Sequence, residues 1–190
     1  MVISSNSFPY HLDFTKVDFR KQPELYRIGV GEQGVLLVEP YKSEILPIWR
    51  FRTVDITQES AEKIWQLFEW YLSQNDFVGA DMARKYLQMW FTRARRYANH
   101  KWGKKYKNGN IDNNIGLEYP YSQGSPNKEN TTLPQLDDAQ SNEKAKSADI
   151  FKTYWFLAKD HPHYIQLKED FRDRYYEKQI KKKTISKKIS

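Results

Sequence analysis

The chain of 190 residues contains no cysteine. This absence excludes a disulfide scaffold and a zinc site built from thiolates. It also fits a reducing compartment, and a cytoplasmic location is the simplest expectation. No stretch approaches the roughly eighteen consecutive apolar residues of a transmembrane helix, so we expect no membrane span. The first twenty residues hold no basic segment followed by an apolar run, so we expect no secretory signal.

Motifs for cofactors and metals are also missing. The sequence has no Walker A loop, G-x-S-x-G or H-E-x-x-H motif. His161 and His163 flank Pro162 at an expected helix start, which is not the i, i+4 spacing of a helical ligand pair. "GVGEQG" from Gly29 to Gly34 matches G-x-G-x-x-G, but the short β-branched run "VLLVEP" follows instead of a helix. We interpret it as a hairpin turn, and we expect no cofactor and no metal.

Aromatic residues, by contrast, are plentiful. They make up 15% of the chain, with six Trp and thirteen Tyr, and they give ample material for a core. We expect one α+β domain over residues 8–177. Residues 108–141 are rich in Asn, Ser, Gln, Gly and Pro and show no apolar pattern, so we expect a disordered insertion there. Residues 178–190 form a lysine-rich tail.

The apolar pattern predicts a mainly α fold with a small N-terminal β element. Short apolar runs at 26–30 and 35–39, and alternation at 49–52, are typical of strands. Helical periodicity covers 58–75 and 76–99, and two later helices start near 142 and 160. Asp55 or Thr57 could cap the first helix, Asp76 the second and Asp160 the fourth. The first two helices are joined by so few residues that we expect an antiparallel hairpin or a helix-turn-helix-like pair.

Positive charge is concentrated in two regions. Residues 82–107 hold nine Lys or Arg and no acid, and residues 178–190 hold six Lys and no acid. These fifteen charges exceed the net charge of +7, so the rest of the chain carries −8. Such segregation points to a polyanionic partner more strongly than the net charge does.

The basic helix and the loop after it provide the candidate binding residues. A solvated helix face normally mixes charges of both signs, and here no acid is present. The helix dipole accounts for only a few cations near the C-terminus. Interleaved aromatics, among them Tyr97 and Tyr106, are suited to stacking on bases. The candidates for phosphate or nucleic-acid contact are Arg84, Lys85, Arg93, Arg95, Arg96, Lys101, Trp102, Lys104 and Lys105.

Two of the residues in this region have a second interpretation. Helical spacing puts Arg93 on the apolar face, where it needs a partner. That partner is either a core carboxylate such as Glu39, Glu44 or Glu62, or an anionic ligand. His100 lies among lysines, which should favour its neutral form, and a neutral imidazole could act as a general base. His100 is therefore the candidate catalytic residue.

Two runs resemble a known family. "EPYKSEILPIWRFRT" and "DFVGADMARKYLQMWFTRARRYANHKWGKKY", with "GEQGVLLVEPYK" before the first, are similar to a family of small proteins catalogued as a domain of unknown function. The likeness covers about residues 12–106 and the last two helices. The stretch from Lys107 to about Ser141 and the tail look like additions. The resemblance implies one domain and supplies no catalytic residue.

Three functions remain open from the sequence. The first is a polyanion-binding module, with nucleic acid as the expected ligand. The second is an enzyme acting on a phosphorylated small molecule or on nucleic acid, with His100 and Arg93 in its site. The third is a structural component of a larger assembly, whose loop and tail order on a partner.

Overall fold

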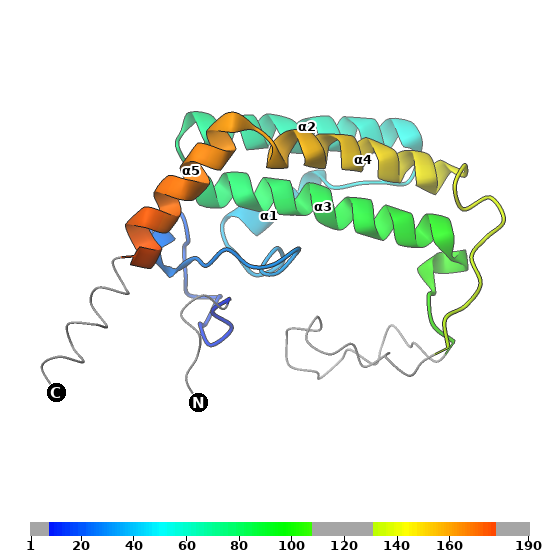
Figure 1. The fold of residues 1–190 in the computed structure, drawn as a ribbon, viewed down its shortest axis with the longest axis horizontal. Coiled ribbons are helices and arrows are strands. Elements are labelled where there is room, and N and C mark those ends of the chain that lie inside the picture. The colour runs from blue at the N-terminus through cyan, green and yellow to red at the C-terminus, as the bar shows by residue number, and fades with distance from the viewer. Residues whose placement is uncertain (1–7, 108–130, 178–190) are drawn as a thin grey trace, which may run out of the picture.

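The computed structural model describes residues 8–107 and 131–177, and this part of the chain is helical (Figure 1). Its α-helices are α1 (Tyr41–Ile45), α2 (Val54–Ser73), α3 (Phe77–Asn99), α4 (Glu143–Lys159) and α5 (Pro162–Arg172). Short 3-10 helices occupy Pro23–Leu25, Leu46–Ile48 and Lys101–Gly103, and a π-helical turn, Asp173–Glu177, follows α5. Helices α2, α3 and α4 lie side by side, and α5 crosses one end of α3.

Side-chain caps fix the starts of the three long helices. The Thr53 hydroxyl accepts from the Ile56 amide at 3.3 Å, so α2 starts earlier than the expected residue 58. The Asp76 carboxylate accepts from the Gly79 amide at 3.0 Å, which confirms the predicted cap of α3. The Asn142 amide oxygen accepts from the Ala145 amide at 3.0 Å and starts α4. In α5 the cap is His161, not Asp160, because Pro162 occupies the first helical position.

The core lies where α2, α3 and α4 meet. Its large side chains include Ile64 and Phe68 from α2, Leu87 from α3 and Phe151 from α4. The first turns of α3 are buried on every side, so this helix is central to the fold. In the core, a hydrogen bond of 3.0 Å between the Thr57 and Ser147 hydroxyls ties α2 to α4. The expected antiparallel α2–α3 pair is present (Figure 1).

The predicted N-terminal β element is wrong, and with it the α+β class. No strand or sheet occurs in residues 8–107 or 131–177. Residues 31–38 form consecutive turns instead, with Leu37 N donating to Gly34 O at 2.9 Å and Val38 N donating to the same oxygen at 3.1 Å. Val35 and Val38 are apolar because they are buried in the helical core, not because they pair with another strand.

The segment expected to be the third strand also has no strand partner among the described residues. The Arg50 amide donates to the Ser60 hydroxyl of α2 at 3.1 Å, so a side chain takes the place of a neighbouring strand. The Trp49 ring stacks on Trp90 of α3 with 3.5 Å between ring centroids. The alternation at 49–52 therefore reflects one extended segment packed across helices.

The expected disordered insertion is too long. Residues 131–141 pack against the end of α3, where Leu133 N donates to Lys105 O at 2.8 Å and Leu136 N to Asn99 O at 2.9 Å. Ala139 in this segment is buried. The rest of the predicted insertion, 108–130, and the tail at 178–190 lie outside the described residues. No helix in the described ranges is long and apolar enough to cross a membrane.

Candidate nucleic-acid interface

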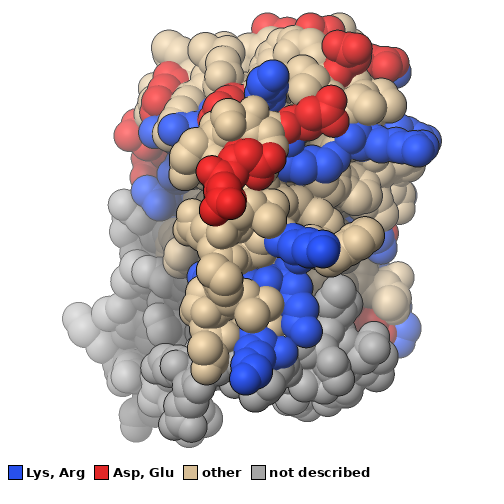
Figure 2. Space-filling model, turned by 90° about the vertical axis from the view of Figure 1, so that its right-hand side faces the viewer, with Lys and Arg blue, Asp and Glu red and all other residues tan. Residues whose placement is uncertain are grey.

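Exposed cations and aromatic rings meet where α3 ends. We call this region the basic end surface and define it by Arg93, Arg96, Tyr97, Lys101, Trp102, Lys104 and Lys105, all of which are exposed. Figure 2 views the end of the molecule that lies at the right of Figure 1. Lys and Arg side chains extend from the centre of this view into its lower half, where few acidic side chains are visible, whereas the upper half shows side chains of both signs.

Arg93 is exposed, which corrects its predicted burial on the apolar face. Its guanidinium carbon lies 5.2 Å from the centroid of the Trp90 ring, so the side chain covers an aromatic face. The three carboxylates considered as its partners are engaged elsewhere. Glu39 pairs with Lys42 at 2.7 Å and Glu44 with Arg20 at 2.8 Å, while Glu62 accepts from Gln58 at 2.7 Å. Arg93 forms no ion pair within the described part of the chain, so its charge is available to a ligand.

Arg96 fixes the loop after α3. Its Nε donates to the Gly103 carbonyl at 2.7 Å. Trp102 and Gly103 both adopt left-handed backbone angles, with φ of +61° and +68°. This turn leaves 80% of the Trp102 side chain exposed, between Lys101 and Lys104. Tyr97, in the last turn of α3, is 43% exposed. Tyr106 is only half-exposed and forms an isolated bridge with Thr132, so it adds little to this surface.

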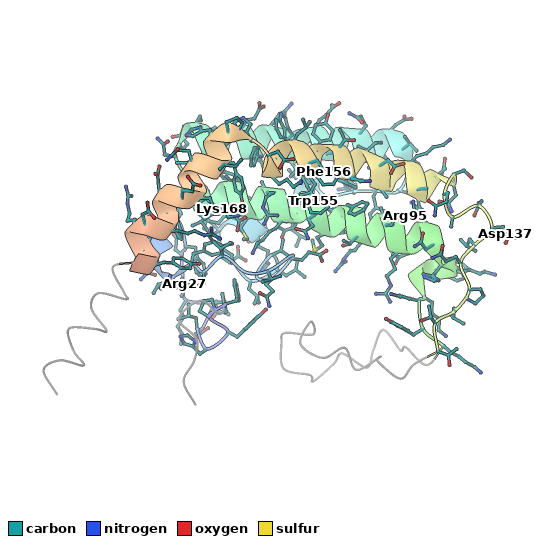
Figure 3. All side chains as sticks on the ribbon, in the orientation of Figure 1. Arg27, Arg95, Asp137, Trp155, Phe156 and Lys168 are labelled. Atoms are coloured by element: carbon teal, nitrogen blue, oxygen red, sulfur yellow. The ribbon has the colours of Figure 1, made fainter. Side chains whose placement is uncertain are left out.

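Arg95 faces the packed segment rather than solvent (Figure 3). Its Nη2 donates to the Asn99 side-chain oxygen at 2.7 Å and also to the Ala139 carbonyl. These two acceptors make Arg95 a clamp between α3 and residues 131–141. Asp137 and Asp138 are exposed acids on the same segment. Asp138 accepts from Asn142 at 3.2 Å, and neither acid forms an ion pair with the basic end surface in the described structure.

His100 is buried, with 4% exposure. Its Nδ1 lies 3.3 Å from the Pro134 carbonyl oxygen, which can only accept, so Nδ1 is the donor. No described contact joins His100 to Arg93. In the described residues there is also no group of three or more His, Asp or Glu side chains that could hold a metal.

Arg84 and Lys85 lie in the core, although helical spacing placed them on the solvent face. Lys85 is completely buried and donates to the Gln33 carbonyl at 2.8 Å. Both cations surround the buried Asp81: Arg84 Nη2 lies 2.8 Å from Asp81 Oδ1, and Lys85 Nζ lies 3.7 Å from Oδ2. They are therefore not part of the basic end surface.

The environment of this network shifts the pKa values of its members. Burial lowers the pKa of Lys85 to about 8, against the opposing attraction of Asp81. Burial alone would raise the pKa of Asp81, but the charges of Arg84 and Lys85 hold it well below its ordinary value. Two tyrosine hydroxyls complete the shell: Tyr164 of α5 donates to Asp81 at 2.7 Å, and Tyr26 donates to the other oxygen. The network thus joins α3, α5 and the N-terminal segment, residues 8–38.

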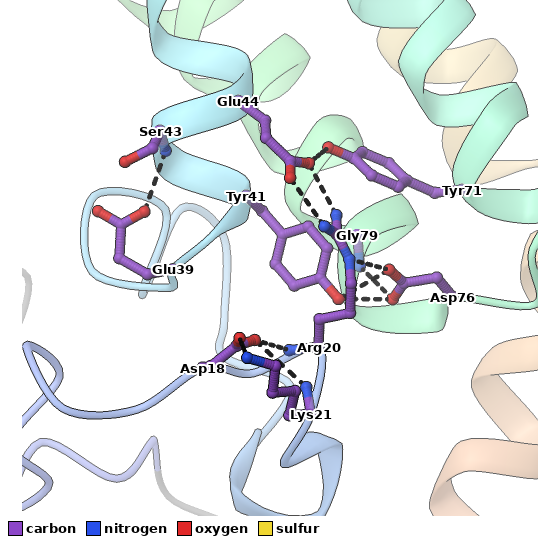
Figure 4. Close-up of polar contacts among 10 residues, drawn as sticks. All are labelled: Asp18, Arg20, Lys21, Glu39, Tyr41, Ser43, Glu44, Tyr71, Asp76 and Gly79. Atoms are coloured by element: carbon purple, nitrogen blue, oxygen red, sulfur yellow. Dashed lines mark hydrogen bonds and ion pairs between the residues drawn. The ribbon is translucent and has the colours of Figure 1, made fainter.

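A second polar cluster, which the sequence did not indicate, lies at the opposite end of α3 (Figure 4). Arg20 forms a bidentate pair with Glu44, with both contacts at 2.8 Å, and Tyr71 donates to the same carboxylate at 2.6 Å. Tyr41 donates to the capping Asp76 at 2.7 Å. These partners lie up to 56 positions from Arg20, so no local motif could reveal them. An open pocket of about 360 Å³ adjoins the cluster, between Trp70, Asp76 and Phe171.

Comparisons with known proteins give one match. Searches of curated proteins and of solved structures each found none. One family model matches residues 9–174, which include every α-helix described above. This agrees with the resemblance seen in the sequence, and the chain belongs to the family described as a domain of unknown function (DUF4385).

Proposed function

We propose that this protein is a nucleic-acid-binding module and that the basic end surface is its contact with the phosphate backbone. The proposal rests on the exposed cations of this surface that have no acidic partner among the described residues. Arg93, Lys101 and Lys104 are exposed and form no ion pair within the described residues. By contrast, two exposed lysines of the N-terminal segment, Lys16 and Lys21, pair with Asp13 and Asp18 at 2.9 and 3.1 Å.

Unpaired cations suit a polyanion because they keep their full charge for the ligand. Each phosphate that a Lys or Arg neutralises releases counterions from the nucleic acid, and this release favours binding at low salt. The exposed rings of Tyr97 and Trp102 favour nucleic acid over other polyanions, since a base can stack on them. A cytoplasmic location is part of the same proposal.

The enzyme alternative draws no support from the geometry. It needs His100 near a substrate bound by Arg93, but His100 is buried against Pro134 and Arg93 lies over Trp90 at the surface. No specific contact favours a purely structural role either. Nucleic-acid binding is therefore the function that we propose.

The test is a salt titration of binding to a labelled oligonucleotide, followed by fluorescence anisotropy. The double variant Arg93→Ala with Lys104→Ala removes two unpaired cations. It should weaken binding and reduce the slope of log K against log salt by roughly one to two phosphate contacts. The control, Lys16→Ala with Lys21→Ala, removes the same charge from paired lysines in the N-terminal segment and should change the slope little.

Two results would overturn the proposal. One is no binding even at low salt. The other is an equal loss of affinity in both double variants, because that would make the effect one of net charge alone. Melting curves for each variant establish that the proteins compared are folded.

A further inference from the structure

Trp102 is the most exposed aromatic side chain in the described structure, and it lies among cations. Its exposure is 80%, whereas Trp90 is 1% exposed. Burying an aromatic side chain is worth on the order of 2 kcal/mol, so leaving it in water forgoes stability. The neighbours in sequence, Lys101 and Lys104, are exposed as well. An apolar ring inside a basic surface is suited to a ligand that is both anionic and aromatic.

The backbone holds Trp102 in this exposed position. A left-handed conformation costs a residue other than glycine on the order of 1 kcal/mol or more, and Trp102 has φ of +61°. Two bonds close the turn: Gly103 N donates to His100 O at 2.8 Å, and Lys104 N donates to Lys101 O at 3.1 Å. The Arg96 side chain then holds Gly103 O at 2.7 Å.

The ring of Tyr97 packs against the same turn. A Cβ on Gly103 would lie 3.0 Å from the Tyr97 ring, so the ring packs directly on the glycine backbone. Tyr97 also contacts Phe51, with ring centroids 5.7 Å apart. Tyr97 is thus fixed between two contacts while part of its ring remains exposed. The result is a turn whose position is set by α3 and whose indole projects into solvent.

We propose that Trp102 stacks on an unpaired base and that the basic end surface therefore prefers single-stranded nucleic acid to a duplex. This inference rests on the proposed function and names its substrate class. In a duplex the base faces are covered by neighbouring base pairs, whereas in a single strand they are open to an aromatic ring. The cations around Trp102 contact the phosphates of the same strand. Stacking on aromatic side chains is tolerant of sequence, so we expect little base preference.

The experiment compares three ligands over the same series of salt concentrations: a labelled single-stranded oligonucleotide, the same sequence annealed to its complement, and inorganic polyphosphate as a competitor without bases. The unsubstituted protein should bind the single strand more tightly than the duplex. Trp102→Ala should weaken binding to the single strand by about 5-fold to 100-fold, the range for loss of one stacked base. Duplex binding and the salt slope should change little, and Trp102→Phe should restore part of the affinity.

The matched control is Trp70→Ala. Trp70 is 49% exposed but belongs to the last turn of α2, at the other end of the helical bundle (Figure 1). It should leave all three affinities unchanged. A melting curve for Trp102→Ala should show a folded protein, because the side chain it removes is in solvent.

The outcomes separate this inference from the proposed function. Equal affinity for single strand and duplex, or a Trp102→Ala variant that binds the single strand normally, would overturn the stacking inference and leave the phosphate surface intact. Absence of binding to either nucleic acid at low salt would overturn both.

Discussion

Asp81 and Arg84 form a buried ion pair one turn apart on α3. The Arg84 Nε and Nη2 atoms lie 2.9 and 2.8 Å from the same carboxylate oxygen, Oδ1 of Asp81. The other oxygen faces Lys85 and accepts a hydrogen bond from Tyr26. One carboxylate thus serves two buried cations, and it does so where the N-terminal segment, α3 and α5 meet.

Asp81→Asn should destabilise the fold severely. The substitution keeps the size of the side chain but leaves the positive charges of Arg84 and Lys85 uncompensated in the core. Breaking a buried pair in this way costs about 3–5 kcal/mol. Urea denaturation of both proteins measures the difference. The control is Asp149→Asn on the exposed face of α4, which should stay within about 0.5 kcal/mol. A loss below about 1 kcal/mol for Asp81→Asn would show that the charges are solvated.

Lys85 should give the protein an unusual pH dependence. Burial lowers the pKa of its ammonium from 10.5 to about 8. Between these values the unfolded chain binds more protons than the folded protein, so this group makes stability rise with pH. Compared with Lys85→Met, the unsubstituted protein should gain on the order of 2 kcal/mol in free energy of unfolding from about pH 7 to about pH 10.

The comparison with Lys85→Met removes the contribution of other titrating groups. Burial raises the pKa of Tyr26 and Tyr164. This lowers the free energy of unfolding only at high pH, where the unfolded chain has lost these protons and the folded protein has not, and it does so in both proteins. Urea denaturation at several pH values supplies the two curves. If their difference is independent of pH, the Lys85 amine is not buried as the structure has it.

The sequence predicted the long helices well because their signals are local. Asp76 precedes apolar residues at helical spacing and caps α3 as predicted, and α4 starts at the predicted place, where Asn142 proves to be its cap. It failed where burial depends on distant segments. Lys85 lies on the polar side of its own helix by spacing, but residues 8–38 cover it, and its partner Gln33 is 52 positions away. Val35 and Val38 looked like strand residues for the same reason.

The same distinction between local signals and burial by distant segments applies to the candidate site. Exposed residues of the candidate site lie in the last two turns of α3 or just after it, and no later segment of the described residues covers them: Arg93, Arg96, Lys101, Trp102 and Lys104. Arg95 is on the same turn, but it faces residues 131–141, which the composition had indicated were disordered. The contact between that segment and α3 is made through backbone groups such as Ala139 O, and these leave no signal in the sequence.

Gly79→Ala should be strongly unfavourable although alanine favours helices. A Cβ at this position would lie 2.6 Å from the Tyr71 ring and 2.8 Å from the Tyr41 ring. Both rings are buried and hydrogen-bonded to carboxylates, so they cannot move aside freely. Overpacking of this kind costs about 1–3 kcal/mol. Thermal melting measures it, with Gln66→Ala on the exposed face of α2 as the control. A melting temperature equal to that of the control would contradict the close packing of α3 on α1 and α2.

Arg95→Ala and Arg93→Ala remove the same charge from positions two residues apart on α3 and should have opposite effects on stability and on binding. Without Arg95, the Ala139 carbonyl loses its charged donor and the Asn99 side chain loses its partner. Leaving such groups unpaired costs about 1–3 kcal/mol. Arg93 contributes only its contact with the Trp90 face, so its loss should cost less than about 1 kcal/mol.

Binding should show the reverse order. Arg93→Ala removes a free cation and should weaken binding to a single-stranded oligonucleotide and reduce the salt slope. Arg95→Ala, assayed well below its melting temperature, should keep most of the affinity because its guanidinium is engaged by Ala139 and Asn99. Urea denaturation measures the free energy of unfolding of each variant, and anisotropy titrations measure its affinity for the oligonucleotide. Arg95 would be a binding residue rather than a clamp if its loss left stability unchanged and reduced affinity as much as the loss of Arg93.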